Sequence, residues 1–297
     1  KDSGDAWSPG WFDLPLAPGE AVTLSLDADG EAMPGLDPVD AAPQDLPQRL
    51  EQALEAFLAR RDEGLTVIAG YPWFLDWGRD TLIACRGLLA SGRAEEAGRI
   101  LRTFAALEVE GSLPNMLGAE STADRDTSDA PLWLALAIEE AAARLGDAFL
   151  DADAGGRSLR AVLASLGEHL RAGARHGVVM DPTSALLWSP AHFTWMDTRY
   201  PMGTPREGYP VEIQALWVRL LRFLDRLDLP SSGEPWATTA VRAEASLDAF
   251  WLADRGWFAD VLLAEAGVPA SEAIPADHLR PNQLFLVTLG LVDGPQA

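Results

Sequence analysis

The sequence predicts an all-α protein, a toroid of paired helices in which one ring of helices lies inside another. Apolar residues recur at helical spacing in eight successive segments from about residue 48 to the C-terminus. These segments also alternate in character. The first, third and fifth have one strongly polar face, whereas the fourth and eighth are apolar all round, as a helix buried on both sides must be. Alternation of this kind is expected when outer and inner helices follow one another along the chain.

The first 47 residues are expected to lie outside the helical domain. In residues 1–29, Val22, Leu24 and Leu26 alternate with polar residues, which predicts a strand. Because one or two strands cannot form a domain alone, we interpret this short β segment as the tail of an upstream β domain. The chain, which begins at Lys1, is therefore expected to be a piece of a longer protein. Residues 30–47 are rich in proline and predict a linker, and residues 48–297 predict a partial helical domain.

Local signals mark where several of the helices begin and end. Ser158 is a suitable N-cap for the fifth helix, and Gly92 and Gly146 are stop signals for the second and fourth. In chain order, the eight helices are expected at residues 50–58, 80–91, 97–104, 128–145, 159–170, 216–224, 241–250 and from 281 onward.

Polar residues gather at the beginnings of the even-numbered helices. Asp80 opens the second helix, Asp129 the fourth and Glu212 the sixth, while residues 280–282 open the eighth. If the even helices form the inner ring, their N-termini meet at one mouth of the toroid. The sequence therefore predicts a pocket there.

The stretch from residue 71 to residue 81 combines aromatic and charged side chains. Flat aromatic faces cover the apolar C–H surface of a sugar ring, while carboxylate and guanidinium groups hydrogen-bond its hydroxyls. The alternative is a buried ion pair of Arg79 with Asp80 or Asp76 that fixes the start of a helix. The candidate sugar-binding residues of this stretch are Tyr71, Trp73, Asp76, Trp77, Arg79 and Asp80.

Further segments carry the same combination of residue types. Carboxylates beside aromatic rings are what glycoside hydrolysis requires. The sequence contains no Gly-rich phosphate loop, no His/Cys metal set and no Ser-His-Asp pattern, so neither a cofactor nor a metal is predicted. The additional substrate-binding candidates are Asn115, Asp129, Trp133, Trp195, Glu212 and Gln214.

Asp197 is the best candidate for the general acid. Such an acid needs a pKa above its usual range, which an apolar setting provides. Asp80, Asp129 and Glu212 begin helices, where the helix dipole favours the charged carboxylate, so they suit hydroxyl binding instead. Asp197 stands in a loop and follows Trp195-Met196 directly. The alternative is a buried aspartate that accepts backbone N–H groups at a turn.

Composition excludes several classes of partner. With 23 basic and 45 acidic residues, the net charge is −22 and the pI is near 4.4. Such a surface repels nucleic acid and anionic lipid but is indifferent to a neutral polysaccharide. No apolar run approaches the ~20 residues of a membrane span. The single cysteine, Cys85, fits a reducing compartment and hence a cytoplasmic location, and we interpret it as an apolar filler.

The clusters resemble the glucosidase module of glycogen debranching enzymes, the amylo-α-1,6-glucosidases. The resemblance implies an (α/α)6 toroid and an inverting hydrolase that removes α-1,6-linked glucose from branch points of glycogen or limit dextrin. It also implies that Asp76, Arg79 and Asp80 grip the terminal glucose. In the related invertases, the aspartate that matches Asp197 is the proton donor. The matching stretches are residues 69–81, 113–115, 127–133, 194–197, 210–217 and 280–283.

One departure from the family pattern leaves alternatives open. The family toroid has twelve helices and carries its general base in a late loop, whereas about eight helices are expected here. The base is therefore expected beyond Ala297, and the chain alone is expected to be inactive. A catalytically incomplete carbohydrate-binding remnant is one alternative, and an invertase-like or trehalase-like (α/α)6 glycosidase is another. Glucose release from limit dextrin, compared with sucrose and trehalose, discriminates between the enzymes. The oligomeric state is left open.

Overall fold

A computed structural model describes residues 13–20, 22, 45–61, 64–70, 74–117, 124–199 and 203–297. The chain divides into two compact units, residues 1–50 and 51–297. In the first unit, the backbone N–H of Gln48 donates to Asp45 Oδ1 at 3.0 Å and the Gln48 side chain accepts from the Asp45 N–H, which together form a capping box. The strand predicted around Leu24 and most of the predicted linker lie outside the described residues.

The described residues form eight α-helices, close to the positions that periodicity predicts. Ser158 caps α5 as expected, accepting a hydrogen bond from Ala161 N at 3.2 Å. Gly146 ends α4 with a φ of 88°, a conformation that favours glycine. The helices are α1 (Leu46–Phe57), α2 (Gly78–Ala90), α3 (Ala94–Ala105), α4 (Ala130–Leu145), α5 (Leu159–Ala172), α6 (Val211–Arg226), α7 (Trp236–Ser246) and α8 (Leu284–Thr288).

The prediction of an all-α toroid is wrong, because thirteen short strands accompany the helices in the described residues. Most strands have two residues, too few for an alternating pattern to show in the sequence. They pair antiparallel within or between the connecting loops. The strands are β1 (Leu58–Arg61), β2 (Gly64–Val67), β3 (Asp76–Trp77), β4 (Met116–Leu117), β5 (Asp153–Ala154), β6 (Arg157–Ser158), β7 (Val179–Met180), β8 (Leu187–Trp188), β9 (Gly208–Pro210), β10 (Trp251–Leu252), β11 (Trp257–Phe258), β12 (Val261–Leu263) and β13 (Ile274–Pro275).

The three-stranded sheet β13-β12-β9 positions the start of α6. Its register pairs Leu263 with Gly208 and Val261 with Pro210. Because α6 follows β9 without a break, the sheet fixes where the first turn of α6 stands. A smaller pair, β3 with β4, does the same for α2, which begins directly after β3.

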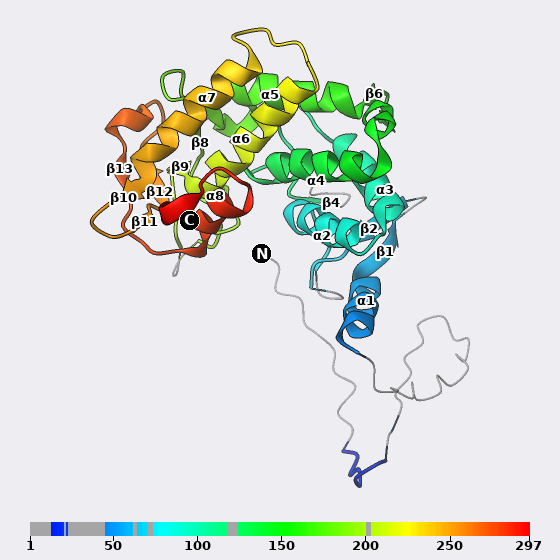
Figure 1. Ribbon diagram of the computed structural model, residues 1–297. Coiled ribbons are helices and arrows are strands. Elements are labelled where there is room, and N and C mark those ends of the chain that lie inside the picture. The colour runs from blue at the N-terminus through cyan, green and yellow to red at the C-terminus, as the bar shows by residue number, and fades with distance from the viewer. Residues whose placement is uncertain are drawn as a thin grey trace. The chain divides into compact units, whose positions relative to one another are not determined.

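Helices α4 and α6 form the centre of the second unit. Both are buried around nearly their whole circumference, whereas α3, α5 and α7 bury one face each. Helix α4 packs against α2, α3 and α6, and α6 also packs against α5, α7 and α8 (Figure 1). Cys85 is fully buried on α2, where burial raises the pKa of its thiol to about 12, consistent with an inert apolar filler.

No helix among the described residues has the length and apolar character needed to cross a membrane.

Candidate active site

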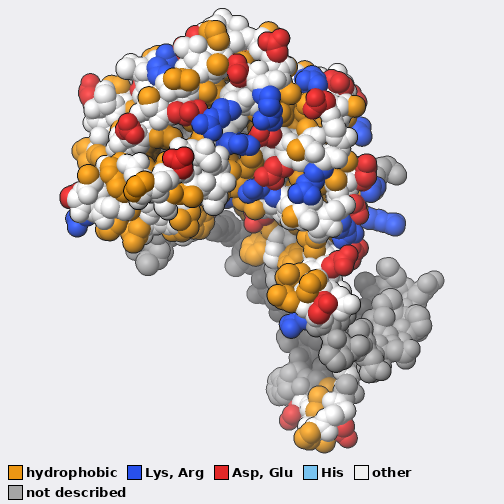
Figure 2. All heavy atoms as spheres, in the orientation of Figure 1, with side chains coloured by type: hydrophobic (Ala, Val, Ile, Leu, Met, Phe, Trp, Pro, Cys, Tyr) orange, Lys and Arg blue, Asp and Glu red, His pale blue; other side chains and the backbone are white. Residues whose placement is uncertain are grey.

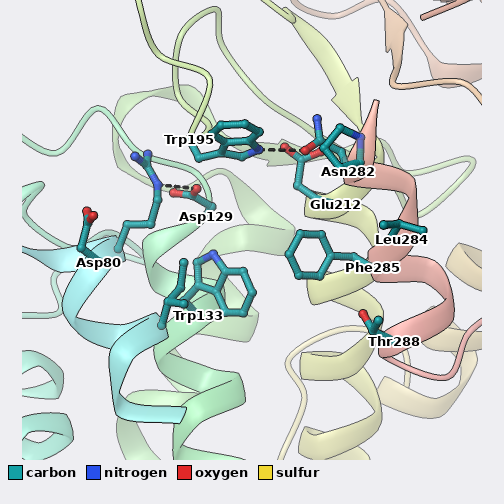
Figure 3. Close-up of a pocket in the computed structure, with 12 residues that line it drawn as sticks. Asp80, Asp129, Trp133, Trp195, Glu212, Asn282, Leu284, Phe285 and Thr288 are labelled. Atoms are coloured by element: carbon teal, nitrogen blue, oxygen red, sulfur yellow. Dashed lines mark hydrogen bonds and ion pairs between the residues drawn. The ribbon is translucent and has the colours of Figure 1, made fainter. Parts of the chain in front are cut away.

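A cavity of about 570 Å³ opens where the first turns of α2, α4 and α6 meet the segment that begins α8 (Figure 3). This is the convergence of even-numbered helix beginnings that the sequence predicts. Six sequence-predicted residues line the cavity together: Arg79, Asp80, Asp129, Trp133, Trp195 and Glu212. The complete lining is Arg79, Asp80, Ile83, Asp129, Trp133, Trp195, Glu212, Pro281, Asn282, Leu284, Phe285 and Thr288.

Aromatic rings form one side of the pocket. Trp133 and Phe285 meet edge to face, with their ring centroids 5.4 Å apart and their planes at 71°. In Figure 3 these two rings lie below the polar side chains, and Trp195 lies above. The Trp195 side is open to solvent, since this residue is 48% exposed. The pocket therefore offers flat apolar faces on two sides of a polar rim.

Arg79 joins two loops of the rim. Its Nε donates to Asp129 Oδ2 at 2.6 Å and its Nη1 to Asp197 Oδ2 at 3.3 Å. Thr127 holds the other oxygen of Asp129 at 2.7 Å. Burial opposes the charge on Arg79, but Asp129 and Asp197 outweigh burial and raise the pKa of this guanidinium. The alternative pairing of Arg79 with Asp80 or Asp76 is thus wrong about the partners, although an ion pair does form.

Asp80 has a different setting from the other carboxylates of the pocket. It is exposed in the first turn of α2, and among the described residues it forms no ion pair. Partial loss of solvation raises the pKa of Asp80 above its usual value, and the carboxylates of Asp129 and Asp197 act in the same direction, against Arg79. Asp80 therefore presents to the pocket a carboxylate that no arginine or lysine of the described residues neutralises.

Glu212 forms a buried ion pair with an arginine that no sequence motif identifies. Arg206 binds both carboxylate oxygens of Glu212, with the Nη2–Oε2 distance at 2.6 Å. On its other side, Arg206 Nε donates to Asp260 Oδ2 at 2.8 Å. The side chains of all three residues are at most 3% exposed. Two features of the sequence could have pointed to this cluster. Asp260 is the single acidic residue in the apolar run 257–263, and Arg206 stands shortly before Pro210.

Four predicted substrate-binding residues do not line the pocket. Asp76 is fully buried in an ion pair with Arg61 at 2.8 Å, and burial raises its pKa. Gln214 is buried and bonds the backbone of Leu187 and Pro210. Asn115 and Trp77 also lie off the pocket; Asn115 bonds Asp124, and Trp77 belongs to β3. Tyr71 and Trp73 lie outside the described residues.

Asp197 lies beside the pocket, linked to it through Arg79. Its side chain is 48% exposed, so the apolar setting inferred from Trp195 and Met196 is not present. The neighbouring Trp195 bonds through its indole N–H to Asn282 Oδ1 at 2.8 Å. The alternative of a buried, backbone-bonded aspartate does not describe this residue either. Within the described ranges, no group of three or more His, Cys, Asp or Glu side chains is placed to hold a metal ion.

A carboxylate-rimmed pocket with aromatic walls defines a carbohydrate-active class of protein, and comparison with known proteins agrees. The crystal structure of a GH78 family rhamnosidase from Bacillus sp. GL1 superposes with a TM-score of 0.52 at 17% identity. The match covers 74% of this chain and 22% of that chain, so it shows a shared fold over a minor part of the rhamnosidase. The family model described as amylo-alpha-1,6-glucosidase matches residues 52–292. The chain belongs to the amylo-α-1,6-glucosidase family, as its motifs indicate.

Proposed function

We propose that this chain binds the terminal α-1,6-linked glucose of a branched α-glucan and takes part in its hydrolytic removal. The observation that carries the proposal is the meeting of Trp133, Phe285 and Trp195 with Arg79, Asp80 and Asp129 around one cavity. The family membership supports a glucosidase reaction, and glycogen or limit dextrin is the corresponding substrate.

The pocket suits a single sugar ring held by stacking and hydrogen bonds. Its volume of about 570 Å³ lies within the roughly 300–1,000 Å³ of small-molecule sites. The rings of Trp133 and Phe285 provide apolar contact for one face of the glucose. The carboxylate of Asp80 and the guanidinium of Arg79 line the cavity, where they can bond its hydroxyl groups. Neutral hydroxyls need no charge compensation, which suits a rim where Arg79, Asp129 and Glu212 are already in ion pairs.

We assign Asp197 as the general acid of an inverting reaction because it matches the proton donor of related glycosidases, and not because of its surroundings, which are exposed. It donates a proton to the glycosidic oxygen while the bond from that oxygen to the anomeric carbon breaks. Water adds to the anomeric carbon from the opposite face and loses a proton to a second carboxylate, giving glucose of inverted configuration. Asp129 and Glu212 are each paired with an arginine, so we assign them to orienting the sugar and not to activating water.

Binding of small sugars tests the proposal. Titration calorimetry of the 297-residue chain with isomaltose and with the iminosugar 1-deoxynojirimycin is expected to show saturable binding. Rhamnose, sucrose and trehalose serve as matched controls and are expected to bind more weakly. Binding of rhamnose, sucrose or trehalose in preference to isomaltose would assign the pocket to another class of glycosidase. Absence of binding to all of these sugars contradicts the proposal.

The assignment of Asp197 is tested in the enzyme that carries this chain. Asp197→Asn should abolish glucose release from limit dextrin while oligosaccharide binding stays nearly intact, because general acid catalysis contributes roughly 10²–10⁴ in rate. Proton NMR of the first-formed glucose anomer reports the stereochemistry. A variant that keeps more than about a tenth of the wild-type kcat would remove Asp197 from this role.

A further inference from the structure

Arg206 makes more polar contacts than any single ion pair requires. Its Nη1 bonds Glu212 and the hydroxyl of Thr194, the latter at 3.0 Å. Its Nη2 bonds Glu212 Oε2 at 2.6 Å and Asp260 at both the backbone oxygen, 3.0 Å, and Oδ1, 3.1 Å. Its Nε bonds Asp260 Oδ2 at 2.8 Å. A guanidinium has five N–H donors, and here all of them have acceptors.

Asp260 extends this contact to Asn282, which also lines the pocket. Its Oδ1 accepts from Asn282 Nδ2 at 2.7 Å and its Oδ2 from Arg280 Nη1 at 2.6 Å. Asn282 in turn accepts the indole N–H of Trp195 at 2.8 Å. Figure 3 shows this last bond, with Trp195 and Asn282 facing each other above Glu212. An unbroken series of hydrogen bonds therefore runs from the carboxylate of Glu212 to the ring of Trp195.

We propose that Arg206 is a positioning residue, which sets the distance between the carboxylate of Glu212 and the ring of Trp195 in the wall of the pocket. Its two carboxylate partners come from separate elements, because Glu212 belongs to α6 and Asp260 lies between β11 and β12. Both carboxylates are buried and need a cation, and Arg280 supplies the second positive charge. The cluster of two acids and two arginines is thus neutral, and its geometry is fixed without any group facing the sugar except Glu212 and Asn282.

The shape of arginine matters here, and its charge alone is not sufficient. A lysine at this position would offer three donors from a single point and could not bind Glu212 and Asp260 bidentately at once. Residue 206 also has a φ of 49°, so the backbone accepts a left-handed conformation to place this side chain. The expected effect of Arg206 on ligand affinity rests on the proposed sugar-binding function, since a sugar is the ligand that Glu212 and Trp195 would contact.

The test compares Arg206→Lys with Arg157→Lys. Arg157 is a suitable control because it also binds a buried acid, Glu108, at 2.8 Å, and it does not line the pocket. Both variants lose a guanidinium that neutralises a buried carboxylate. Calorimetry with isomaltose is expected to show about a tenfold or larger loss of affinity in Arg206→Lys and no loss in Arg157→Lys.

A spectroscopic readout separates positioning from general destabilisation. In protein labelled with 5-fluorotryptophan, the ¹⁹F resonance of Trp195 is identified by its absence in Trp195→Phe. This resonance is expected to shift or broaden in Arg206→Lys and to stay unchanged in Arg157→Lys. If Arg206→Lys does not fold, Asp260→Asn provides the comparison, because it keeps the Arg206–Glu212 pair and weakens the contacts of residue 260 with Arg206, Arg280 and Asn282.

Each outcome supports or overturns the proposal. An unchanged Trp195 resonance together with unchanged isomaltose affinity in the folded variant overturns it. If the wild-type chain binds none of the sugars, the proposed function fails, but the Trp195 resonance of the unliganded variants still tests whether Arg206 positions that ring.

Discussion

Arg61 and Arg79 each bind an aspartate that the sequence assigned to sugar recognition, yet their surroundings differ. Arg61 closes off Asp76, which is fully buried and also accepts from Thr66 Oγ1 at 3.1 Å. Arg79 binds Asp129 and Asp197 but still lines the cavity. The residue types in the sequence are the same for both pairs. What separates a structural pair from a ligand-binding pair is whether a face of the pair reaches solvent in the pocket.

We predict that Arg79→Lys weakens sugar binding although the positive charge is kept. A lysine can bind Asp129 or Asp197 but cannot form two directed contacts and still present a donor to a hydroxyl. Loss of one hydrogen bond to a charged group costs about 1.5–3 kcal/mol, or roughly tenfold or more in Kd. Calorimetry with isomaltose measures this loss.

Asp76→Asn is the matched variant for that measurement. It is expected to lower the melting temperature, because Arg61 loses its anionic partner, and to leave the Kd for isomaltose unchanged. The opposite pattern, with affinity lost in Asp76→Asn and kept in Arg79→Lys, would return Asp76 to the sugar site.

At the scale of single elements, β9 is the strand that positions the start of α6 and therefore Glu212. Gly208 in this strand has a φ of 127° and lies against β12. A Cβ at this position would overlap the carbonyl oxygen of Leu262 and come within 2.7 Å of Ala264 N. Both neighbours are backbone atoms of a paired strand and the residue that follows it, and they cannot move without disturbing the sheet. The glycine thus allows β12 to approach closely and places Glu212 at the start of α6.

We predict that Gly208→Ala lowers the free energy of unfolding by more than the roughly 1–3 kcal/mol of backbone strain alone. Gly256→Ala is the control, since Gly256 also has a positive φ, 76°, but has open space around its Cβ position. Urea unfolding of both variants gives the comparison. Equal losses in the two variants would mean that the close approach to Leu262 contributes nothing.

The connection between β7 and β8 is fixed by a carboxylate whose contribution depends on pH. Asp181 accepts hydrogen bonds from Thr183 N, Ser184 N, Ser184 Oγ and Ala270 N at 2.6–3.3 Å. Burial alone would raise the pKa of Asp181, but the hydrogen bonds, that of the Ser184 hydroxyl foremost, outweigh burial and lower it below the usual 3.8. Since the unfolded chain then binds protons more readily, this stabilisation is complete above pH 3.8 and is lost as the pH falls through the lower, folded value.

We predict that Asp181→Asn costs about 1–3 kcal/mol of unfolding free energy at pH 7 and at pH 5 alike. The difference from wild type should narrow only below pH 3.8, where the folded carboxylate takes up its proton. Urea titrations across this range measure it. Asp254→Asn, at a side chain that is 83% exposed, is the control and should stay within about 0.5 kcal/mol of wild type. If the difference in unfolding free energy between wild type and Asp181→Asn shrinks already between pH 7 and pH 5, the lowered pKa of Asp181 is contradicted.

For the molecule as a whole, the net charge of −22 affects charged and neutral ligands differently. On the face shown in Figure 2, basic and acidic side chains of the second unit are interspersed, so local pairs coexist with a large negative excess in the chain. Such an excess attracts cations over a distance of about 10 Å at 0.1 M salt. A neutral glucan experiences no such attraction.

We predict that raising NaCl from about 20 mM to about 500 mM weakens binding of the cationic iminosugar 1-deoxynojirimycin several-fold and leaves isomaltose binding within about twofold. The reason is that salt screens the attraction between the acidic protein and the ammonium group. Calorimetry at both salt concentrations tests this. Equal salt dependence of the two ligands would show that salt alters the pocket itself.

Much of the fold could be predicted from the sequence because helices leave local signals. The periodic apolar residues of α4 and α6, the cap at Ser158 and the glycine stop at Gly146 each act within a few residues of chain. The placement of Asp80, Asp129 and Glu212 at helix beginnings follows from the same signals. These local signals, together with the family motifs, are therefore enough to predict a pocket at these helix beginnings.

Which charged groups face one another depends instead on how distant segments of the chain pack. Arg79 pairs with Asp197, which is 118 residues away along the chain, and Arg206 pairs with Asp260, which is 54 residues away. No local sequence pattern encodes such pairings. The strands between helices were missed because two residues carry no period, and the all-α class was wrong for that reason. The residue types of Asp76 and Gln214 suit sugar binding. In the folded protein, however, both are buried, where Asp76 pairs with Arg61 and Gln214 bonds the backbone. Residue type is a property of the chain, but solvent access and partners arise only when distant segments pack.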